Sequence, residues 1–522
     1  MALDEGVPLE AWGPIDGLQY VLLLLATYIL LRLTQSKSTI PLINGKKRFE
    51  LSGHRVRNAF LTQLPDLLQA GLAKADVFRL LTPAGMRFVL APKFAHEIPS
   101  HPGLSPGEFT MANMNAHISG FEVLSQTSQH HIVQDAVRTK LTRKLSKSLC
   151  SITFIFSDLT PPAKLTKPLS DETAVILKEQ WTDDPTWHEL SLSPSAITLI
   201  SRLSSMVFVG NKIGRNAEWL ELVVNYSAEV FSASNELNLW PRVLRPLVAH
   251  FSPSCRRLRH YIQRARSILL PVVKERRKAN ASGAEGDIDD AIQWFEEVAN
   301  GTNFDPTLTQ LTLALGSIHT SSDLLNQVII DLCERSDWEE LACEMRKEIT
   351  NALDETGWQK IALNNLKLMD SILKESQRMK PASLVTLGRK ATQTMQLSDG
   401  TIIPSGSSLF VANVAMRDPK IYPNPDSFDP YRFSKLRDAG DNSAYLVSPS
   451  PAHLGFGLGE HACPGRFFVA NEIKIILCHM LMKYDMKLVD GYKSSTENIG
   501  ITYWSNRAAK ILVRRRQEET TF

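Results

Sequence analysis

A cysteine near the C-terminus lies in a sequence that suits metal ligation. Cys463 is the eighth residue of segment 456–465, which reads Phe-Gly-Leu-Gly-Glu-His-Ala-Cys-Pro-Gly and leads directly into an apolar stretch. Gly459 and Gly465 allow the backbone to pass close to a flat macrocycle and to turn its amides toward the sulfur. The N-terminal end of a following helix favours the deprotonated thiol. The spacing therefore predicts a thiolate ligand for a haem iron, against the alternative of a buried free cysteine.

Three further segments follow the pattern of one known family. Segment 375–378 has the form Glu-x-x-Arg, segment 428–433 carries another arginine, and segment 316–321 lies in a long apolar stretch. With the cysteine loop, and in this order, they resemble the cytochromes P-450 from about residue 49 to the end. The resemblance implies a mainly α fold with a small β region, the cytochrome P-450 fold. It also implies haem b with an axial thiolate from Cys463.

The resemblance places oxygen chemistry in the middle of a long helix. Oxygen activation on haem needs protons delivered to dioxygen in a site from which bulk water is excluded. Thr320 matches the family's threonine for this relay, and Gly316 matches the small residue that makes room for dioxygen. His319 stands where the family commonly has an acid, so either His319 or the neighbouring Ser321 could share the relay. The alternative for these hydroxyls is back-bonding to the preceding turn. A haem carrier would need no such relay.

The haem propionates call for cationic partners. The resemblance implies Arg389, Arg138 and His461 for that role, with His461 in place of the family's usual arginine. Phe456, which opens the cysteine motif, is expected beside the cofactor. The Glu-x-x-Arg pair and Arg432 are expected to form a buried charge network that fixes the cysteine loop.

The N-terminal sequence predicts a membrane anchor. Residues 17–31 contain no charge, and 17–33 approach the ~20 residues that cross a bilayer. A cleaved signal peptide would carry basic charge before its apolar core, whereas here the preceding residues are acidic and the following ones basic. The charge order predicts a luminal tail at 1–16, a single-pass transmembrane helix at 17–33, a hinge at 34–48 and a cytosolic catalytic domain at 49–522. The membrane is expected to be that of the endoplasmic reticulum.

Composition narrows the function further. The net charge of +3 in 522 residues is too small to suggest nucleic-acid binding, and six cysteines without paired spacing predict no disulfide framework.

Asp305 and Pro306 predict a helix start, and the apolar pattern continues to about Cys333, which gives a helix of roughly 40 Å. Segments 87–90 and 408–411 predict strands.

Two other patterns imitate catalytic motifs. Segment 103–107 reads Gly-Leu-Ser-Pro-Gly, as in the nucleophile elbow of serine hydrolases, but Pro106 lacks the N–H that would serve as oxyanion donor. His96 and His101 imitate a zinc helix, but they are five residues apart with Pro99 between them. Both motifs are excluded.

Two alternatives to a monooxygenase remain. One is a haem-thiolate isomerase or dehydratase that does not use O2, and the other is a non-catalytic haem-binding protein.

The substrate is indicated more weakly. Segments 103–128 and 382–387 fall where the family lines its haem pocket, and their Met, Phe and Ile residues suit a bulky apolar molecule. The motifs resemble filamentous-fungal members that oxidise terpenoids, which implies a terpenoid-type secondary metabolite. No dinucleotide fingerprint stands in a strand–turn–helix context, so electrons are expected from an NADPH-cytochrome P-450 reductase, with cytochrome b5 as a further candidate. Arg466 and Lys474 near the cysteine loop are expected to meet that partner.

Overall fold

The computed structural model describes residues 39–517 apart from 49, 51, 130, 143–164, 283–287 and 493–494. The chain divides into two compact units, Met1–Pro41 and Leu42–Phe522. The predicted luminal tail 1–16 and anchor 17–33 lie outside the described residues, as does the part of the predicted hinge before residue 39.

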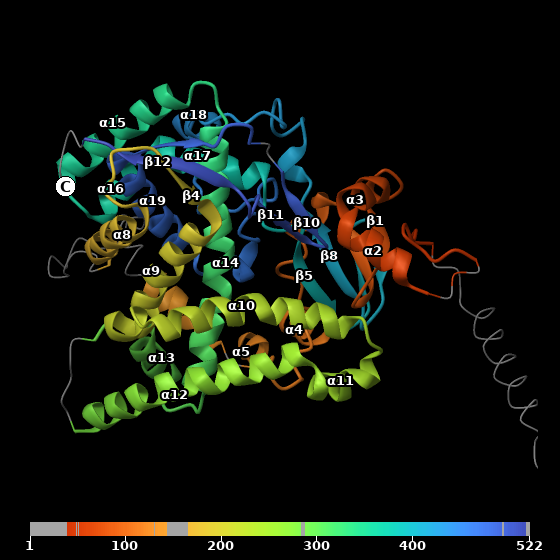
Figure 1. Ribbon diagram of the computed structural model, residues 1–522. Helices are drawn as coiled ribbons and strands as arrows, with labels where there is room; N and C mark the ends of the chain where they lie inside the picture. Colours follow the sequence, from red (N-terminus) through yellow and green to blue (C-terminus); the bar gives the residue numbers. More distant parts are fainter. Residues whose placement is uncertain are drawn as a thin grey trace, which may run out of the picture. The chain divides into compact units, whose positions relative to one another are not determined.

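Helices make up most of the second unit, as predicted (Figure 1). The longer ones are α8 (Thr166–Trp181), α9 (Leu192–Gly214), α10 (Ala217–Asn238), α12 (Pro253–Ala281), α14 (Pro306–Cys333), α15 (Trp338–Thr356), α17 (Lys367–Met379) and α19 (Arg466–Lys483). The shorter ones are α2 (His54–Thr62), α3 (Leu64–Leu72), α4 (Pro106–Asn113), α5 (Val123–Gln129), α6 (Ile132–Ala136), α11 (Arg245–Phe251), α13 (Ala291–Ala299), α16 (Lys360–Asn365) and α18 (Arg432–Asp438). Single turns are η1 (Pro92–His96), η2 (Val137–Leu141), η3 (Arg242–Leu244), η4 (Ala415–Arg417), η5 (Asn442–Ala444) and η6 (Gly459–His461).

The strands form one five-stranded sheet and three smaller ones. The large sheet has the order β1 (Val77–Thr82), β2 (Gly85–Leu90), β8 (Ser408–Ala412), β5 (Val385–Ala391), β3 (Leu104–Ser105). Two of the others are pairs, β10 (Glu497–Ile499) with β11 (Thr502–Trp504) and β6 (Met395–Gln396) with β7 (Ile402–Ile403). In the third, the central strand β12 (Lys510–Arg515) pairs with β4 (His188–Ser191) on one side and β9 (Tyr484–Leu488) on the other. Both predicted strands are confirmed, in β2 and β8, and these two pair in parallel. Helices α2 and α3 lie beside this sheet in Figure 1.

Helix α14 runs through the middle of the helical region and contacts α9, α10, α12, α17 and α19 (Figure 1). Its start is fixed locally: Asp305 Oδ1 accepts from the N–H groups of Thr307, at 2.8 Å, and Leu308, at 3.2 Å, and Pro306 occupies the first turn. The predicted start and the predicted end at Cys333 are both confirmed. A helix packed on so many sides holds its middle residues in fixed positions.

Among the described residues, one helix is long and apolar enough to cross a membrane, and it is α9. Most of its apolar window, 78%, is buried within the protein, where α9 packs against α14. Packing in the core accounts for its composition.

Helix α19 carries a carboxyl group in the core. Glu472 is fully buried, the Ser204 hydroxyl of α9 donates to its Oε1 at 2.9 Å, and within the described chain its Oε2 has no partner. Burial raises the pKa of Glu472 to about 8, from an ordinary value of 4.5. The side chain is therefore mostly protonated at neutral pH.

This carboxyl group predicts a pH-dependent stability. The pKa of Glu472 is higher in the folded protein than in the unfolded chain, so protonation of Glu472 favours the folded state. This contribution to stability is complete below about pH 4.5 and is lost as the pH rises toward 8. Glu472→Gln, which keeps an oxygen for Ser204, should remove this component, worth at most about 1.4 kcal/mol per pH unit. The measurement is the melting temperature of wild type and variant between pH 5 and 8. Parallel curves for the two proteins would contradict the prediction.

Candidate active site

The loop before α19 is folded tightly around Cys463. The Cys463 N–H donates to the Phe456 carbonyl at 2.8 Å, and the Ala462 N–H donates to the Gly459 carbonyl at 3.0 Å. Gly459 has φ +73°, and a Cβ there would lie 2.6 Å from the side chain of Pro99. No other residue type fits that position without displacing its neighbour. The Phe456 side chain is half-buried and packs on the main core cluster.

The sulfur of Cys463 faces the N-terminus of α19. The backbone N–H groups of Gly465 and Arg466 form hydrogen bonds to it. Burial, the largest influence, raises the pKa of the Cys463 thiol, while the two N–H groups and the Arg466 guanidinium lower it. Sulfur-directed amides are the arrangement that stabilises a metal-bound thiolate, so the loop fits the predicted role.

The Glu-x-x-Arg motif forms the expected buried network. Glu375 and Arg378 of α17 are fully buried and pair through two contacts, Nε to Oε2 at 2.7 Å and Nη2 to Oε1 at 2.9 Å. Arg432 Nε donates to both Glu375 oxygens at 3.1 Å. The same helix meets the start of the cysteine loop, because Gln377 Oε1 lies 3.1 Å from His453 Nε2. The network therefore ties α17 to segment 428–433 close to the loop.

Breaking this network should be costly. Glu375→Gln would leave Arg378 and Arg432 without a buried counter-charge, and the free energy of unfolding should fall by ~3–5 kcal/mol. Urea unfolding of the haem-loaded protein measures the loss, with Glu340→Gln, at an exposed position of α15, as the matched control. A Glu375→Gln variant as stable as the control would show that the network contributes little.

The three cations predicted for the propionates do lie together. Arg138 Nη2 donates to the Glu460 carbonyl, and His461 Nε2 lies 3.3 Å from the Glu460 carboxylate. Burial lowers the pKa of His461, and so do the charges of Arg389, Arg138 and His131, while Glu460 opposes them. Two arginines and two histidines therefore gather beside the cysteine loop. His131 was not predicted, although its spacing of seven residues from Arg138, two helical turns, was a usable signal.

Arg389 provides the test of fit. Its side chain is buried, at 4% exposure, and Nη1 donates to the Gly388 carbonyl at 3.0 Å. Its Nε and Nη2 have no partner in the described part of the chain. A buried guanidinium with two free donors calls for an anion, and the carboxylates of haem supply that chemistry. The donor set fits the cofactor.

The middle of α14 has one open face. Gly316 and Thr320, one turn apart, are exposed, although Ser317, Ile318 and Ser321 are buried. A Cβ added to Gly316 would meet nothing within 4 Å. The Thr320 hydroxyl donates to the Gly316 carbonyl at 3.2 Å, which is the back-bonding alternative, yet its oxygen can still accept a hydrogen bond from that open side.

His319 and Ser321 do not share that face. His319 is half-buried, and its Nε2 lies 3.2 Å from the Val224 carbonyl of α10. Burial lowers the pKa of His319. Ser321 is buried, and its hydroxyl has no partner among the described residues. Thr320 therefore lies in different surroundings from His319 and Ser321. A proton relay shared by the three residues stays a prediction, and the positions of His319 and Ser321 do not favour it.

The predicted pocket walls are anchored on the sheet. Phe109 of α4 packs edge-on against Phe410 of β8, with ring centroids 5.2 Å apart. A Cβ added at Gly388 would lie 2.7 Å from the ring of Phe109. Strand β5 shifts register between Thr386 and Arg389, and Leu387 has φ +51°. Such a strained, bulged residue re-aims its neighbours and is typical of functional sites. The sequence pattern gave no sign of this bulge.

The first of the two excluded motifs has a structural role. Ser105 caps α4 by accepting from the Glu108 N–H at 3.1 Å. Across the described residues, which include His96 and His101, no group of three or more His, Cys, Asp or Glu side chains could hold a metal ion.

The partner role expected of Lys474 is wrong. Lys474 is buried, pairs with Asp370 at 2.7 Å and donates to the Leu363 carbonyl at 3.1 Å. Arg466 is half-buried and donates to the carbonyls of Val447 and Cys463, at 3.0 and 2.8 Å. Both side chains stabilise this protein internally, because α19 is covered on nearly every side.

Comparisons with known proteins give a consistent set of relatives. A family model described as Cytochrome P-450 matches residues 116–507. The chain is 53% identical to the cytochrome P-450 monooxygenase ausG of Aspergillus calidoustus, over 96% of this chain and 92% of that protein. It is 48% identical to the cytochrome P-450 monooxygenase trt6 of Aspergillus terreus, over 92% and 93% of the two chains. It is 41% identical to the cytochrome P-450 monooxygenase adrA of Penicillium rubens over the full length of both.

Proposed function

Because this chain belongs to the cytochrome P-450 family and is a monooxygenase that holds haem through a cysteine thiolate, we propose that Cys463 is the axial ligand. The observation that carries the proposal is the pair of backbone N–H groups, from Gly465 and Arg466, directed at its sulfur. Haem so ligated supplies activation of O2 and insertion of one oxygen atom into a substrate.

The side chains around the loop have separate tasks in this proposal. Arg389, with Arg138, His461 and His131, binds and orients the cofactor through its carboxylates, as the unpartnered nitrogens of Arg389 suggest. Thr320 accepts a hydrogen bond on the open face of α14 and guides a proton toward the reacting oxygen. The packed walls from α4 and β5 keep bulk water out.

We further propose that the substrate is a bulky apolar fungal secondary metabolite of terpenoid type. The support is the resemblance of the motifs around Thr320 and Cys463, together with pocket segments rich in Met and Phe. A spectral-shift screen of the purified haem protein against terpenoid, polyketide, alkaloid and fatty-acid panels tests the proposal. Binding confined to a class other than terpenoids would overturn the substrate assignment but leave the monooxygenase intact.

The redox partner and the membrane also belong to this proposal. We infer that an NADPH-dependent reductase, with cytochrome b5 as a further donor, delivers the electrons. Residues 17–33 would hold the catalytic domain on the cytosolic face of the endoplasmic reticulum, where both proteins share one surface. Purified enzyme with NADPH alone should give no turnover until the reductase is added. Turnover without reductase would contradict the proposal.

A further inference from the structure

Asp323 shares the open face of α14 with Gly316 and Thr320. An α-helix turns by about 100° per residue, so positions 316, 320 and 323 fall within about 60° of one another around the helix axis. Gly316 and Thr320 are exposed, and Asp323 is half-buried. Side chains three residues apart on a helix are neighbours, with Cβ atoms about 5–6 Å apart. A carboxyl group therefore lies next to the Thr320 hydroxyl.

Ser505 fixes the orientation of this carboxyl group. Asp323 Oδ1 accepts from the Ser505 N–H at 2.9 Å and from the Ser505 hydroxyl at 2.7 Å. Ser505 is 2% exposed, so both donors are held in place by packing. Asp323 Oδ2 makes no hydrogen bond with any residue that the structure describes. One carboxyl oxygen is therefore held, and the other is left for a further partner.

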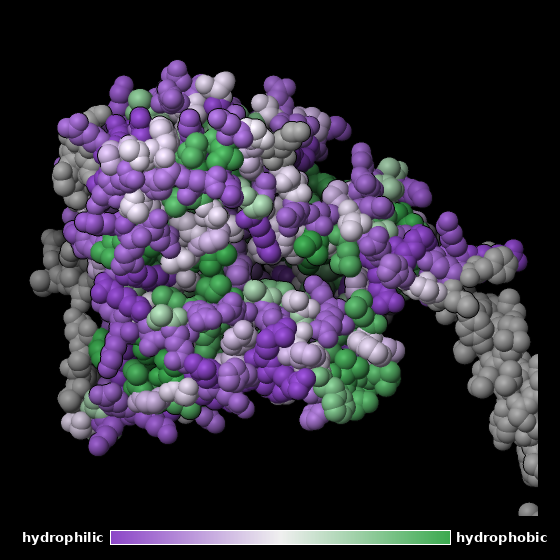
Figure 2. All heavy atoms as spheres, in the orientation of Figure 1, coloured by the Kyte–Doolittle hydropathy of each residue, from purple (hydrophilic) through white to green (hydrophobic). Residues whose placement is uncertain are grey.

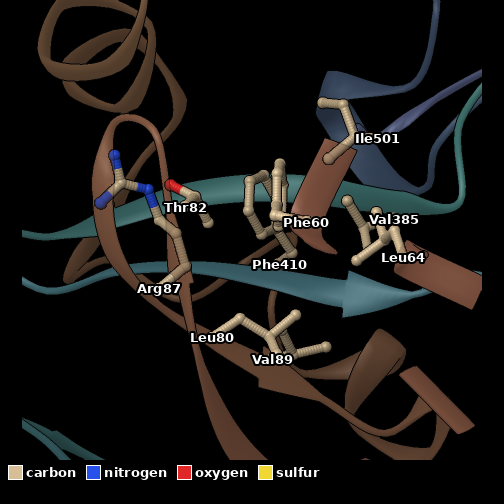
Figure 3. Close-up of a pocket in the computed structure, with 9 residues that line it drawn as sticks. All are labelled: Phe60, Leu64, Leu80, Thr82, Arg87, Val89, Val385, Phe410 and Ile501. Atoms are coloured by element: carbon tan, nitrogen blue, oxygen red, sulfur yellow. The ribbon is translucent and has the colours of Figure 1, made fainter. Parts of the chain in front are cut away.

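The position of Ser505 is set by the hairpin of β10 and β11, which ends one residue before it. In the turn of this hairpin, the Ile501 carbonyl accepts from the Leu384 N–H at 2.9 Å. Figure 3 shows the Ile501 side chain among apolar residues that include Phe60 and Val385. The hairpin is therefore anchored at its turn, and Ser505 presents its donors to α14 from a fixed place.

Two cations lie near the Asp323 carboxyl group. Burial raises the pKa of Asp323, while the hydrogen bonds from Ser505 and the charges of Arg507 and Lys380 lower it in part. Within the described chain, neither cation forms an ion pair with Asp323. The Arg507 guanidinium is exposed and lies 4.2 Å from the centre of the Trp504 ring. Figure 2 shows a hollow near the middle of this face of the molecule, where Figure 1 draws α14 beside β11. Solvent can therefore exchange protons with the half-buried carboxyl group.

His319, at the position where the family commonly has an acid, is directed elsewhere. Its Nε2 lies 3.2 Å from the Val224 carbonyl of α10. Burial, followed in effect by the charge of Arg507, lowers the pKa of His319. The side chain is therefore mostly neutral at pH 7 and faces α10. Asp323, and not His319, is the titratable side chain beside Thr320 on its own face of the helix.

We propose that Asp323 supplies the proton that Thr320 guides, through a water molecule held between the two side chains. This water donates one hydrogen to Thr320 Oγ1, gives the other to the reacting oxygen and takes the proton of Asp323 Oδ2 in its place. Solvent then returns a proton to the carboxylate, so one proton has moved and no electrons. Asp323 acts through Thr320 and does not touch the reacting atoms. This inference rests on the proposed function and deepens it.

The test uses the reduced, haem-loaded protein with carbon monoxide bound, and infrared spectroscopy measures the stretching frequency of the carbon monoxide. In the wild type the band should shift between about pH 4 and 8, because Asp323 loses its proton and the water loses a hydrogen-bond donor. Asp323→Asn should abolish this shift, and Asp323→Glu, which keeps a carboxyl group, should restore it. Thr320→Ala should also abolish the shift, because the water loses its acceptor.

Asp331 provides the matched control. It lies on the same helix about two turns further on, and it is half-buried like Asp323. Its two oxygens accept from the Ser376 hydroxyl and the Gln327 amide, both at 2.5 Å, and burial raises its pKa to about 6. Asp331→Asn should keep the wild-type shift, and so should His319→Ala.

The wild-type titration can overturn the proposal without any variant, since a band that does not change with pH would contradict it. A shift that persists in Asp323→Asn, or that His319→Ala removes, would contradict it as well. The thiolate-type spectrum of the same complex shows whether each variant is folded around haem. Its absence from the wild type would contradict the assignment of Cys463, whereas a normal spectrum with no pH-dependent shift would contradict only the role of Asp323.

Discussion

Replacing Cys463 with histidine is expected to remove the thiolate-type absorption spectrum of the reduced carbon monoxide complex while haem is still bound. The cations beside the loop would still hold the cofactor's carboxylates, so haem content should remain measurable. A thiolate ligand would supply the electron density that oxygen activation needs, and an imidazole would supply less, so most monooxygenase activity should be lost. Absorption spectroscopy of the reduced, carbon monoxide-treated protein measures the change.

The matched control for Cys463→His lies on the following helix. Cys478 is also buried on α19 and is a free thiol, but no backbone N–H is directed at its sulfur in the described structure. Cys478→Ala should therefore keep the thiolate spectrum. An unchanged spectrum in Cys463→His would show that another residue ligates the iron.

Thr320→Ala is expected to uncouple electron consumption from product formation. The hydroxyl lies on the open face of α14. Among the described residues it makes one hydrogen bond, to the Gly316 carbonyl of the same helix. Its loss should therefore leave haem content and substrate affinity nearly intact. Reducing equivalents would still be consumed, but more would be released as hydrogen peroxide. A proton-relay contribution is typically about 10²–10⁴-fold, and ordered water can replace part of it.

The measurement is the ratio of product formed to NADPH consumed, for wild type, Thr320→Ala and His319→Ala. Since His319 bonds to the Val224 carbonyl, its substitution should affect stability more than coupling. If Thr320→Ala stays coupled and His319→Ala does not, the relay belongs to the histidine and the assignment of Thr320 is wrong.

The sequence was informative wherever a local rule determines the structure. Asp305 and Pro306 set the start of α14 through side-chain capping and a fixed φ, both of which depend only on neighbouring residues. The strands at 87–90 and 408–411 followed from local composition. The pairing of Glu375, Arg378 and Arg432 was also predicted, although only the resemblance connected Glu375 with Arg432, 57 positions later.

What could not be predicted depends on which neighbour each side chain meets. Lys474 looked like a surface cation, but Asp370 of another helix pairs with it in the core. His319 and Thr320 are adjacent in sequence, yet a helix turns successive residues by about 100°, so they face different surroundings. The bulge at Leu387 depends on the register of two strands that local composition does not set.

The burial of α9 has a consequence for biosynthesis. Its partner α14 begins about 90 residues later in the chain, so at 5–20 residues per second α9 emerges roughly 5–20 s before the surface that covers it. If synthesis takes place at a membrane, this apolar segment could be inserted by mistake. The serines of α9, including Ser201, Ser204 and Ser205, lower its hydrophobicity and find buried places once the protein is folded. We therefore expect replacement of these serines by leucine or valine to increase misinsertion and degradation of the nascent chain.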